Sequence, residues 1–542
     1  MSLNKADTNK SGKQFFSGVI VLALSTFLVK LIGLLYKIPM MKYLGPEGMG
    51  YFNSAYEIYT LFFIISTAGL PVALSIMISE NKTSGKLKNV KKIFRVSLFL
   101  LGFIGLLGAV FMGAFSDKLS VLINNREARF CILAISPTVL FICISSAIRG
   151  YFQGNQIMWP TAISQVIESL GKLGLGLTFA IVAINKGYSM GRVAAYAVLG
   201  LTIGVGISML FLVICKLIYK PRTEAVLLSR ETQPSSQIIK RLLAIAIPIT
   251  LSSAVMSMTR IIDMAMILNR LVVSLGYSES MANEIYGSYS TMAVSVYNLP
   301  TTLITAVALP IVPMLTSALE SGDKAKEQST VTSAIKLTAL IAFPSTLGLA
   351  VFSKPILELL FSSRPAEVEY VAPLLSILGI SVFLSCMITL TNSILQAYKM
   401  VNIPIISMLA GAIVKIVISF ILIGIKEVNI YGAPISTFFS TLTIVAINIY
   451  FIVKKIGKIE RVGKLFARPF FSAFLAMIAG VGAYVLLETY VRFGGNIAIA
   501  ITLVALLYVI LVLKLGAIDR EDIMMLPLGD SIAKGLEKIK LL

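Results

Sequence analysis

Residues 16–41 read FSGVIVLALSTFLVKLIGLLYKIPMM, an apolar stretch that is interrupted only by Lys30 and Lys37. A helix of about 20 apolar residues is long enough to cross the hydrocarbon core of a bilayer. The run continues beyond the length of a signal peptide, and no small-residue cleavage site ends it. The stretch therefore predicts a first transmembrane helix.

The rest of the chain repeats this pattern. Of the 542 residues, 57% are hydrophobic and 13% are charged, whereas about 25% are charged in an ordinary soluble domain. Further apolar runs cover residues 49–79, 96–116, 130–153, 157–185, 193–217, 241–270, 285–318, 331–353, 370–397, 402–425, 430–453, 469–488 and 495–515. We therefore expect an all-α polytopic membrane protein with 14 transmembrane helices.

The distribution of basic residues gives the orientation. With the N-terminus inside, 30 of the 47 Lys and Arg residues fall in cytoplasmic segments and 11 in external ones. This asymmetry satisfies the positive-inside rule and places both termini in the cytoplasm. The net charge of +21 is thus mainly a sign of topology, and no nucleic-acid partner is expected.

Several kinds of chemistry are excluded by composition. The chain has no His, so it lacks His general bases, Ser-His triads and His metal ligands. Its four cysteines are widely spaced without a CxxC pair, and we interpret them as buried packing residues: Cys131, Cys143, Cys215 and Cys386. No catalytic residues, metal site or cofactor are predicted, and no P-loop indicates ATP.

Two internal matches predict a repeat. Leu-Pro71 corresponds to Leu-Pro310, 239 residues later, and Pro160 corresponds to Pro404, 244 residues later. Because each half holds six helices, the two halves have the same orientation, and the transport site is expected between them. The predicted parts are an N-terminal lobe (1–217), a cytoplasmic linker (218–240), a C-terminal lobe (241–455), two extra helices (456–515) and a cytoplasmic tail (516–542).

Charged residues inside the predicted helices are candidates for function. A charge at the bilayer centre costs about 2.5–3.5 kcal/mol on insertion scales, so each requires a reason. Six are basic and three acidic: Lys30, Lys37, Arg149, Lys172, Arg260, Lys415, Glu57, Glu168 and Asp263. Since the cations exceed the acids by three, some cations must face water or an anionic ligand.

Lys30 and Lys37 are seven residues apart and share one helix face. They either form a cationic stripe along a cavity or, for Lys37 especially, extend to the membrane interface. Glu57 is a possible partner of Lys37. Arg149 is either a cytoplasmic anchor or the mouth of the cavity.

The other charges suggest pairs along single helices. Arg260 and Asp263 are spaced i, i+3, and Glu168 and Lys172 are spaced i, i+4, so each pair could simply satisfy itself. In the functional alternative, Arg260 binds an anion while Asp263 holds a coupling cation or releases Arg260. Lys415 has no charged neighbour on its own helix.

A basic intramembrane site suits a compact, multiply charged anion such as phosphate or pyrophosphate, because Lys and Arg donate charge-assisted hydrogen bonds to it. A cationic drug would instead favour a cavity with net acidic charge.

Three motifs resemble a known family. They are YLGPEGMGY at 43–51, ISSAIRGYFQG at 144–154, and Pro160 followed by SQVIE at 164–168. They are similar to stage V sporulation protein B and its relatives in the multidrug/oligosaccharidyl-lipid/polysaccharide exporter superfamily, which includes the MurJ-type lipid II flippases. The resemblance covers roughly residues 15–515. The basic pair of the first helix differs from the MurJ pattern, which has a cation at the position of Tyr36 and Asp at that of Lys37.

The resemblance implies a V-shaped pair of six-helix bundles with alternating access in the bacterial cytoplasmic membrane. It implies flipping of an undecaprenyl-pyrophosphate-linked cell-wall or sporulation precursor such as lipid II. The two extra helices would border a groove for the lipid tail. We expect a monomer that uses no cofactor, with Na⁺ or H⁺ as a possible coupling cation or the membrane potential as driving force.

In this hypothesis Lys30, Lys37, Arg260 and Lys415 bind substrate, and Arg149 lines the cytoplasmic mouth. Gating or ion coupling falls to Asp263, Glu57, Glu168 and Lys172. The alternative is a cation-coupled multidrug exporter that uses Asp263 and Glu57. A membrane glycosyltransferase or acyltransferase is disfavoured, because the chain has no large extramembrane domain and no His.

Overall fold

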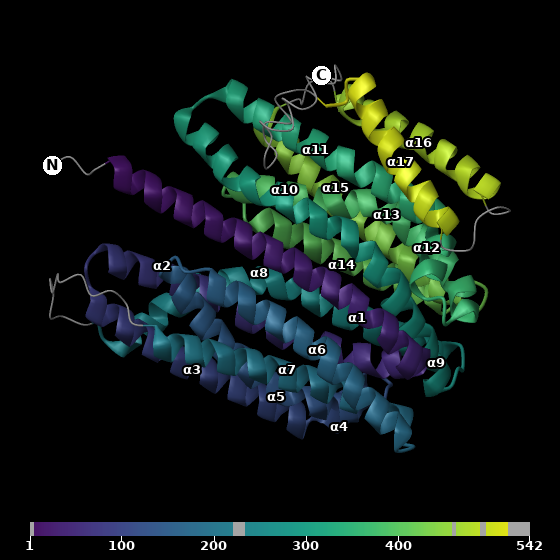
Figure 1. The fold of residues 1–542 in the computed structure, drawn as a ribbon, viewed down its shortest axis with the longest axis horizontal. Coiled ribbons are helices and arrows are strands. Elements are labelled where there is room, and N and C mark those ends of the chain that lie inside the picture. Colours follow the sequence, from purple (N-terminus) through teal and green to yellow (C-terminus); the bar gives the residue numbers. More distant parts are fainter. Residues whose placement is uncertain (1–4, 220–232, 458–461, 488–494, 519–542) are drawn as a thin grey trace. The chain divides into compact units, whose positions relative to one another are not determined.

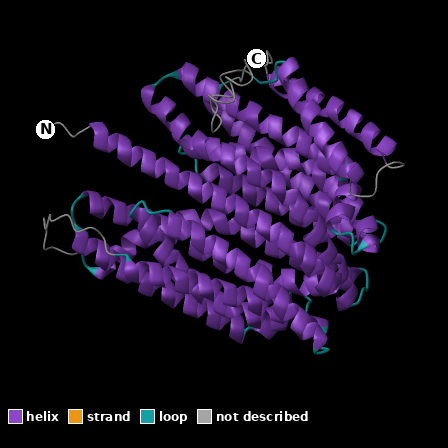
Figure 2. Ribbon diagram, in the orientation of Figure 1, coloured by secondary structure: helices purple, strands orange, loops and turns teal. Residues whose placement is uncertain are grey.

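The structure, a computed structural model, describes residues 5–219, 233–457, 462–487 and 495–518, and all their regular elements are helices (Figures 1 and 2). Most of the predicted linker and of the predicted tail lies outside the described residues. The helices of the first part of the chain are α1 (Lys5–Thr67), α2 (Leu70–Thr83), α3 (Leu87–Ala114), α4 (Ser116–Leu122), α5 (Ala128–Gly154), α6 (Trp159–Asn185), α7 (Met190–Ile218), α8 (Ser235–Asn269) and α9 (Glu279–Ser288).

The helices that follow are α10 (Val294–Ser321), α11 (Lys324–Val351), α12 (Ser353–Leu360), α13 (Pro365–Ala397), α14 (Asn402–Ile423), α15 (Gly432–Ile456), α16 (Val462–Leu487) and α17 (Gly495–Lys514). Short π-helical turns follow α8 at Arg270–Ser274 and α9 at Tyr289–Ala293, and a 3₁₀ turn at Asn429–Tyr431 precedes α15.

Proline and glycine mark several helix ends. Pro71, Pro160 and Pro365 stand in the first turn of α2, α6 and α13, where the missing N–H costs no hydrogen bond. Gly322 ends α10 with a φ of 69°, a conformation that glycine adopts without strain. The second predicted helix therefore divides, because a new helix begins at Leu70.

Among the described residues, 12 helical segments are long and apolar enough to cross a membrane. The first, Leu28–Thr83, covers part of the first predicted helix and all of the second. Helix α1 joins the two across a kink at Gly45 with φ 66°. The eighth predicted helix corresponds to α9, a π-helical turn and α10. The all-α polytopic class is confirmed, whereas the count of 14 stays a prediction.

Contacts divide the chain into two compact units, Met1–Thr291 and Met292–Leu542. The first unit extends beyond the predicted N-terminal lobe, because α8 packs against α1, α2 and α3, and α9 packs against α1. Glycine allows two of these close approaches. A Cβ on Gly69 would lie 2.2 Å from the carbonyl oxygen of Ala246, and one on Gly287 would lie 1.9 Å from that of Pro46.

The most extensive helix contact of the first unit joins α6 and α7. A Cβ on Gly200 would lie 2.4 Å from the Cα of Gly176, and one on Gly204 would lie 3.0 Å from the Cα of Gly171. Small residues allow membrane helices to approach backbone to backbone. This contact sets the rotation of α6 about its axis, and with it the directions in which Glu168 and Lys172 point.

The second unit contains the pairs α11 with α13, α14 with α15, and α16 with α17, and α16 also packs on α11. Buried polar side chains join its helices: Ser419 donates a hydrogen bond of 2.7 Å to Ser436, and Asn448 donates one of 2.8 Å to Asn392. Large apolar side chains remain exposed on both units, as expected for surfaces that face lipid.

The cysteines are free thiols. Three are buried as predicted, and Cys215 is only partly buried.

Candidate functional site

The cationic stripe lies on the first arm of α1, before the kink at Gly45. Lys30 is exposed and Lys37 is half-buried. Lys37 lies within electrostatic range of Lys30, Lys172 and Glu57, of which the two lysines repel it and Glu57 attracts it. The structure thus brings three predicted cations and one predicted acid into one neighbourhood of the first unit.

Arg260 of α8 adds a fourth cation. Its Nε lies 3.6 Å from Oε2 of Glu57 on the second arm of α1, and the two side chains are 51% and 25% exposed. The distance is long for a charge-assisted hydrogen bond, which is typically 2.7–2.9 Å. Arg260 is therefore held loosely, and its partner is Glu57 across two helices.

Asp263 is also in this neighbourhood. It and Glu57 both lie within electrostatic range of Tyr286, a buried residue of α9. Glu168 attracts Lys172 and is itself bonded to Arg149, so the described residues of this neighbourhood include five cations and three carboxylates, and the local balance remains positive.

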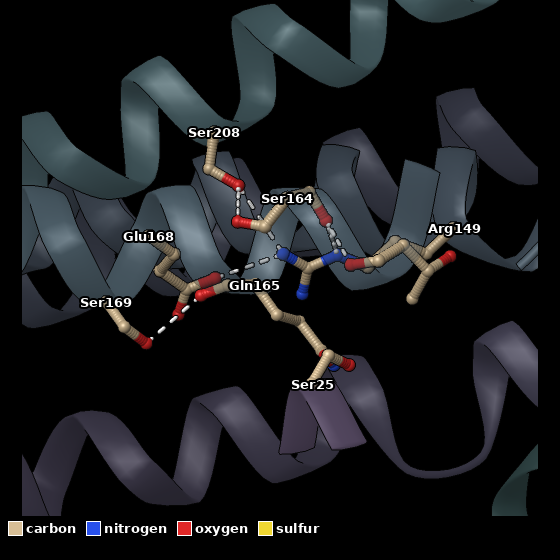
Figure 3. Close-up of polar contacts among 8 residues, drawn as sticks. Ser25, Arg149, Ser164, Gln165, Glu168, Ser169 and Ser208 are labelled. Carbon is tan, nitrogen blue, oxygen red and sulfur yellow. Dashed lines mark hydrogen bonds and ion pairs between the residues drawn. The ribbon is translucent and has the colours of Figure 1, made fainter. Parts of the chain in front are cut away.

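Arg149 is buried and lies in a network of polar contacts (Figure 3). Its guanidinium donates hydrogen bonds to Ser164 at 3.0 Å, to Glu168 at 3.0 Å and to Ser208 at 3.5 Å. The Arg149 side chain is 8% exposed and that of Glu168 is 24% exposed. Side chains of α6 and α7 hold the guanidinium, and a place for Arg149 at the cytoplasmic mouth stays a prediction.

Two further contacts surround this network. Ser208 donates a hydrogen bond of 2.7 Å to the carbonyl oxygen of Ser164, and Ser25 of α1 donates one of 3.4 Å to the Gln165 side chain (Figure 3). Three helices of the first unit, α5, α6 and α7, thus meet at Arg149. Glu168 is paired with Arg149 and not with Lys172 one turn further on.

The Lys172 ammonium lies against aromatic rings. Its Nζ is 4.3 Å from the ring centroid of Tyr56, 5.1 Å from that of Tyr36 and 5.8 Å from that of Phe52. Sequence reasoning missed these rings, because aromatic residues are common in membrane helices and nothing in their spacing distinguishes a cation site from packing.

Lys415 is on α14 of the second unit and is half-buried. It has contacts of its own within the part of the chain that the structure describes. Within that part, no three His, Cys, Asp or Glu side chains gather as a metal site would require.

Residues 15–320 match the family model described as polysaccharide biosynthesis protein. The chain belongs to this family. Residues 248–421 also match the MatE model.

Similar proteins of Bacillus subtilis (strain 168) include stage V sporulation protein B, with 23% identity over 95% of this chain and 98% of that protein. They also include the lipid II flippase MurJ, with 25% identity over 78% of this chain and 79% of that protein. The chain is thus homologous to flippases and transporters, as its sequence predicted, and these relatives are not enzymes.

Solved structures show the same fold. The lipid II flippase MurJ in an inward closed conformation matches with a TM-score of 0.69 and 16% identity, over 91% of this chain and 98% of that one. An inward-facing multidrug resistance MATE family transporter matches with a TM-score of 0.65 and 16% identity, over 82% of this chain and 99% of that one.

Proposed function

We propose that the protein flips an undecaprenyl-pyrophosphate-linked precursor, lipid II or a related lipid-linked oligosaccharide, from the inner to the outer leaflet of the bacterial cytoplasmic membrane. The observation that carries this proposal is the positive cluster around Lys37. Among the described residues, five cations gather there within membrane-spanning helices, and three carboxylates accompany them. An anionic head group supplies the missing negative charge.

Lys30, Lys37 and Arg260 bind the pyrophosphate in this proposal. Lys30 is exposed, and among the described residues it makes no hydrogen bond or ion pair. Arg260 is half exposed and only loosely paired. Both side chains can therefore donate charge-assisted hydrogen bonds to phosphate oxygens without first breaking a well-formed contact.

Glu57 acts as the counter-ion that the substrate replaces. When the pyrophosphate approaches Arg260, its oxygens compete with the Glu57 carboxylate at 3.6 Å. When the head group leaves, Arg260 returns to Glu57. This exchange couples occupancy of the site to the contact between α1 and α8. Asp263, on α8, provides a second carboxylate that would bind a coupling cation such as Na⁺ or H⁺.

Arg149 positions Glu168 in this account. A buried guanidinium with three hydrogen-bond partners would have to abandon them in order to bind a ligand, leaving Glu168 without its counter-ion. Glu168 remains a candidate for ion coupling, because it is partly exposed. Lys415 remains a predicted substrate contact from the second unit.

The membrane potential supplies a driving force for a positive site. An inside-negative potential is worth about 2.3 kcal/mol per charge per 100 mV. It favours outward movement of an anionic head and return of the unoccupied cations to the cytoplasmic side. The polyprenyl tail would stay in lipid beside α16 and α17, whose exposed residues include Phe471 and Leu486.

A flipping assay tests this function. The full chain is reconstituted in liposomes with a fluorescent undecaprenyl-pyrophosphate-linked sugar, and the probe reaching the opposite leaflet is measured with and without an imposed potential. We expect flipping that depends on the protein and is lost in Lys30→Ala. Flipping at the rate of protein-free liposomes under every potential would refute the proposal.

The rival function is export of organic cations, which the MatE match over residues 248–421 favours. The charges oppose it, because an organic cation at this cluster would meet Lys30, Lys37, Lys172 and Arg260. Uptake of a cationic dye into the same liposomes separates the two functions.

A further inference from the structure

Three aromatic rings of α1 surround the ammonium of Lys172. Tyr36 comes from the arm before the kink at Gly45, and Phe52 and Tyr56 come from the arm after it. The rings also touch one another: the centroids of Tyr36 and Phe52 are 6.1 Å apart, and those of Phe52 and Tyr56 are 6.0 Å apart in a stacked arrangement. Together they form the three-ring cage, defined by Tyr36, Phe52 and Tyr56.

The rings are the nearest partners of Lys172. Within the described residues it makes no hydrogen bond and no ion pair. Glu168, one helical turn earlier, attracts it electrostatically but is bonded to Arg149 at 3.0 Å. The positive charge of Lys172 is therefore stabilised by π faces and is not neutralised by a carboxylate.

Such a cage has a known chemistry. Ring faces attract a cation through their quadrupole, and cages of several rings recognise quaternary and methylated ammonium ligands. Tyr36 and Phe52 are each 1% exposed, whereas Tyr56 and Lys172 are only half-buried. The cage is thus closed at its base and reachable from the side of Tyr56, and a side chain of the same chain already fills it.

We propose that Lys172 is a specificity-determining residue that occupies the three-ring cage and thereby excludes organic cations. Removing Lys172 would convert the cage into a binding site for small ammonium ions. The benefit of this exclusion for an anionic substrate rests on the proposed function, whereas the occupancy of the cage does not.

Chemical complementation tests the cage directly. Lys172→Ala removes Cγ, Cδ, Cε and Nζ, the same set of heavy atoms that n-propylammonium contains. We expect millimolar n-propylammonium chloride to raise the thermal unfolding midpoint of the purified variant by about 2 °C at saturating concentration. The wild type and Lys172→Arg, in which the cage is filled, should show no rise beyond that caused by sodium chloride.

Two controls test whether the stabilisation by n-propylammonium depends on its charge and on the ring of Tyr56. The neutral analogue 1-propanol has the same shape but no charge, so it should not stabilise Lys172→Ala. Adding Tyr56→Leu to Lys172→Ala removes the nearest ring and should abolish the response to n-propylammonium. An equal response to the alcohol, an unchanged response in the double variant, or no response in Lys172→Ala would overturn the proposal.

A second measurement applies if Lys172→Ala does not fold. Phenylalanines with increasing fluorination at position 56 weaken the attraction between the ring face and the Lys172 ammonium stepwise. They should therefore lower the unfolding midpoint stepwise. The matched series at Tyr196, which stacks on Tyr188 at 5.5 Å, should show no such trend, because no cation of the described residues lies over that ring. A flat series at position 56 would contradict the cage, and it would leave the binding of lipid-linked substrate by Lys30 and Arg260 unaffected.

Discussion

Nε of Arg260 and Oε2 of Glu57 lie 3.6 Å apart, which joins α8 to the second arm of α1 through two charges inside the membrane. Arg149 and Glu168 form a different kind of pair, because they lie 3.0 Å apart and the arginine has two further hydrogen-bond partners. The first pair can exchange partners at low cost, whereas the second holds three helices together. We therefore assign ligand exchange to Arg260 and Glu57, and helix packing to Arg149 and Glu168.

Glu57→Gln should strengthen substrate binding. The variant removes the carboxylate that competes with a phosphate for Arg260. A partly exposed pair at this distance is worth at most about 1 kcal/mol, so the affinity for undecaprenyl pyrophosphate should rise by up to about fivefold. Isothermal titration of the purified protein measures the change.

The control for this prediction is Glu80→Gln, which breaks a more exposed pair with Arg241 at 2.6 Å outside the cluster. It should leave the affinity unchanged. A weaker affinity in Glu57→Gln would show that the carboxylate helps to bind the ligand.

Arg149→Ala should destabilise the fold. It leaves Glu168 in a largely buried position without its counter-ion, and breaking a buried pair costs about 3–5 kcal/mol, somewhat less here because Glu168 is partly exposed. The unfolding midpoint in detergent checks this.

The double variant Arg149→Met, Glu168→Gln removes both charges and should recover most of the lost stability. If Arg149→Ala unfolds like the wild type but no longer binds the pyrophosphate, Arg149 is a ligand-binding residue and the assignment as a positioning residue is wrong.

Lys30→Ala should weaken substrate binding and leave the stability almost unchanged, the reverse of what we expect for Arg149→Ala. Lys30 is exposed and makes no hydrogen bond within the described residues, so its loss should change the stability by no more than about 0.5 kcal/mol. A charge-assisted hydrogen bond contributes about 1.5–3 kcal/mol, and the affinity for undecaprenyl pyrophosphate should fall at least about tenfold. Parallel melting and binding curves of one preparation make the comparison.

Gly200→Ala should destabilise the contact of α6 with α7. The new Cβ would lie 2.3 Å from the backbone nitrogen of Gly176, and overpacking of this kind costs about 1–3 kcal/mol. Gly174→Ala is the control on α6, because a Cβ there meets nothing within 4 Å. Its expected effect is neutral or slightly stabilising. Equal melting points for the two variants would contradict this packing.

Much of the fold follows from the sequence. Apolar runs of about 20 residues locate helices, because a membrane imposes both their length and their composition. The division within 49–79 was less predictable, since Gly69 both precedes the first residue of α2 and lets α8 approach closely. The kink at Gly45 was also hard to predict. Its positive φ changes the direction of α1, and the spacing of apolar residues does not reveal such a change.

The site was predicted only in part. Sequence reasoning selected the charged residues, because charge within a membrane helix is costly enough to require a cause. It paired them along single helices, Arg260 with Asp263 and Glu168 with Lys172, whereas the structure shows the pairs Arg260 with Glu57 and Arg149 with Glu168 across helices. These partners depend on the rotation of each helix, which packing determines and the spacing of charges does not.

The central claim is that Lys30 and Arg260 bind an anionic, pyrophosphate-linked head group. The most direct test measures binding of lipid II, undecaprenyl phosphate and a cationic dye to the purified wild type, Lys30→Ala, Arg260→Ala and Asp263→Asn. The account predicts that the wild type binds lipid II more tightly than undecaprenyl phosphate, that both alanine variants lose this binding, and that the dye does not bind. Dye binding that survives both alanine substitutions but fails in Asp263→Asn would contradict the account and establish a cation exporter.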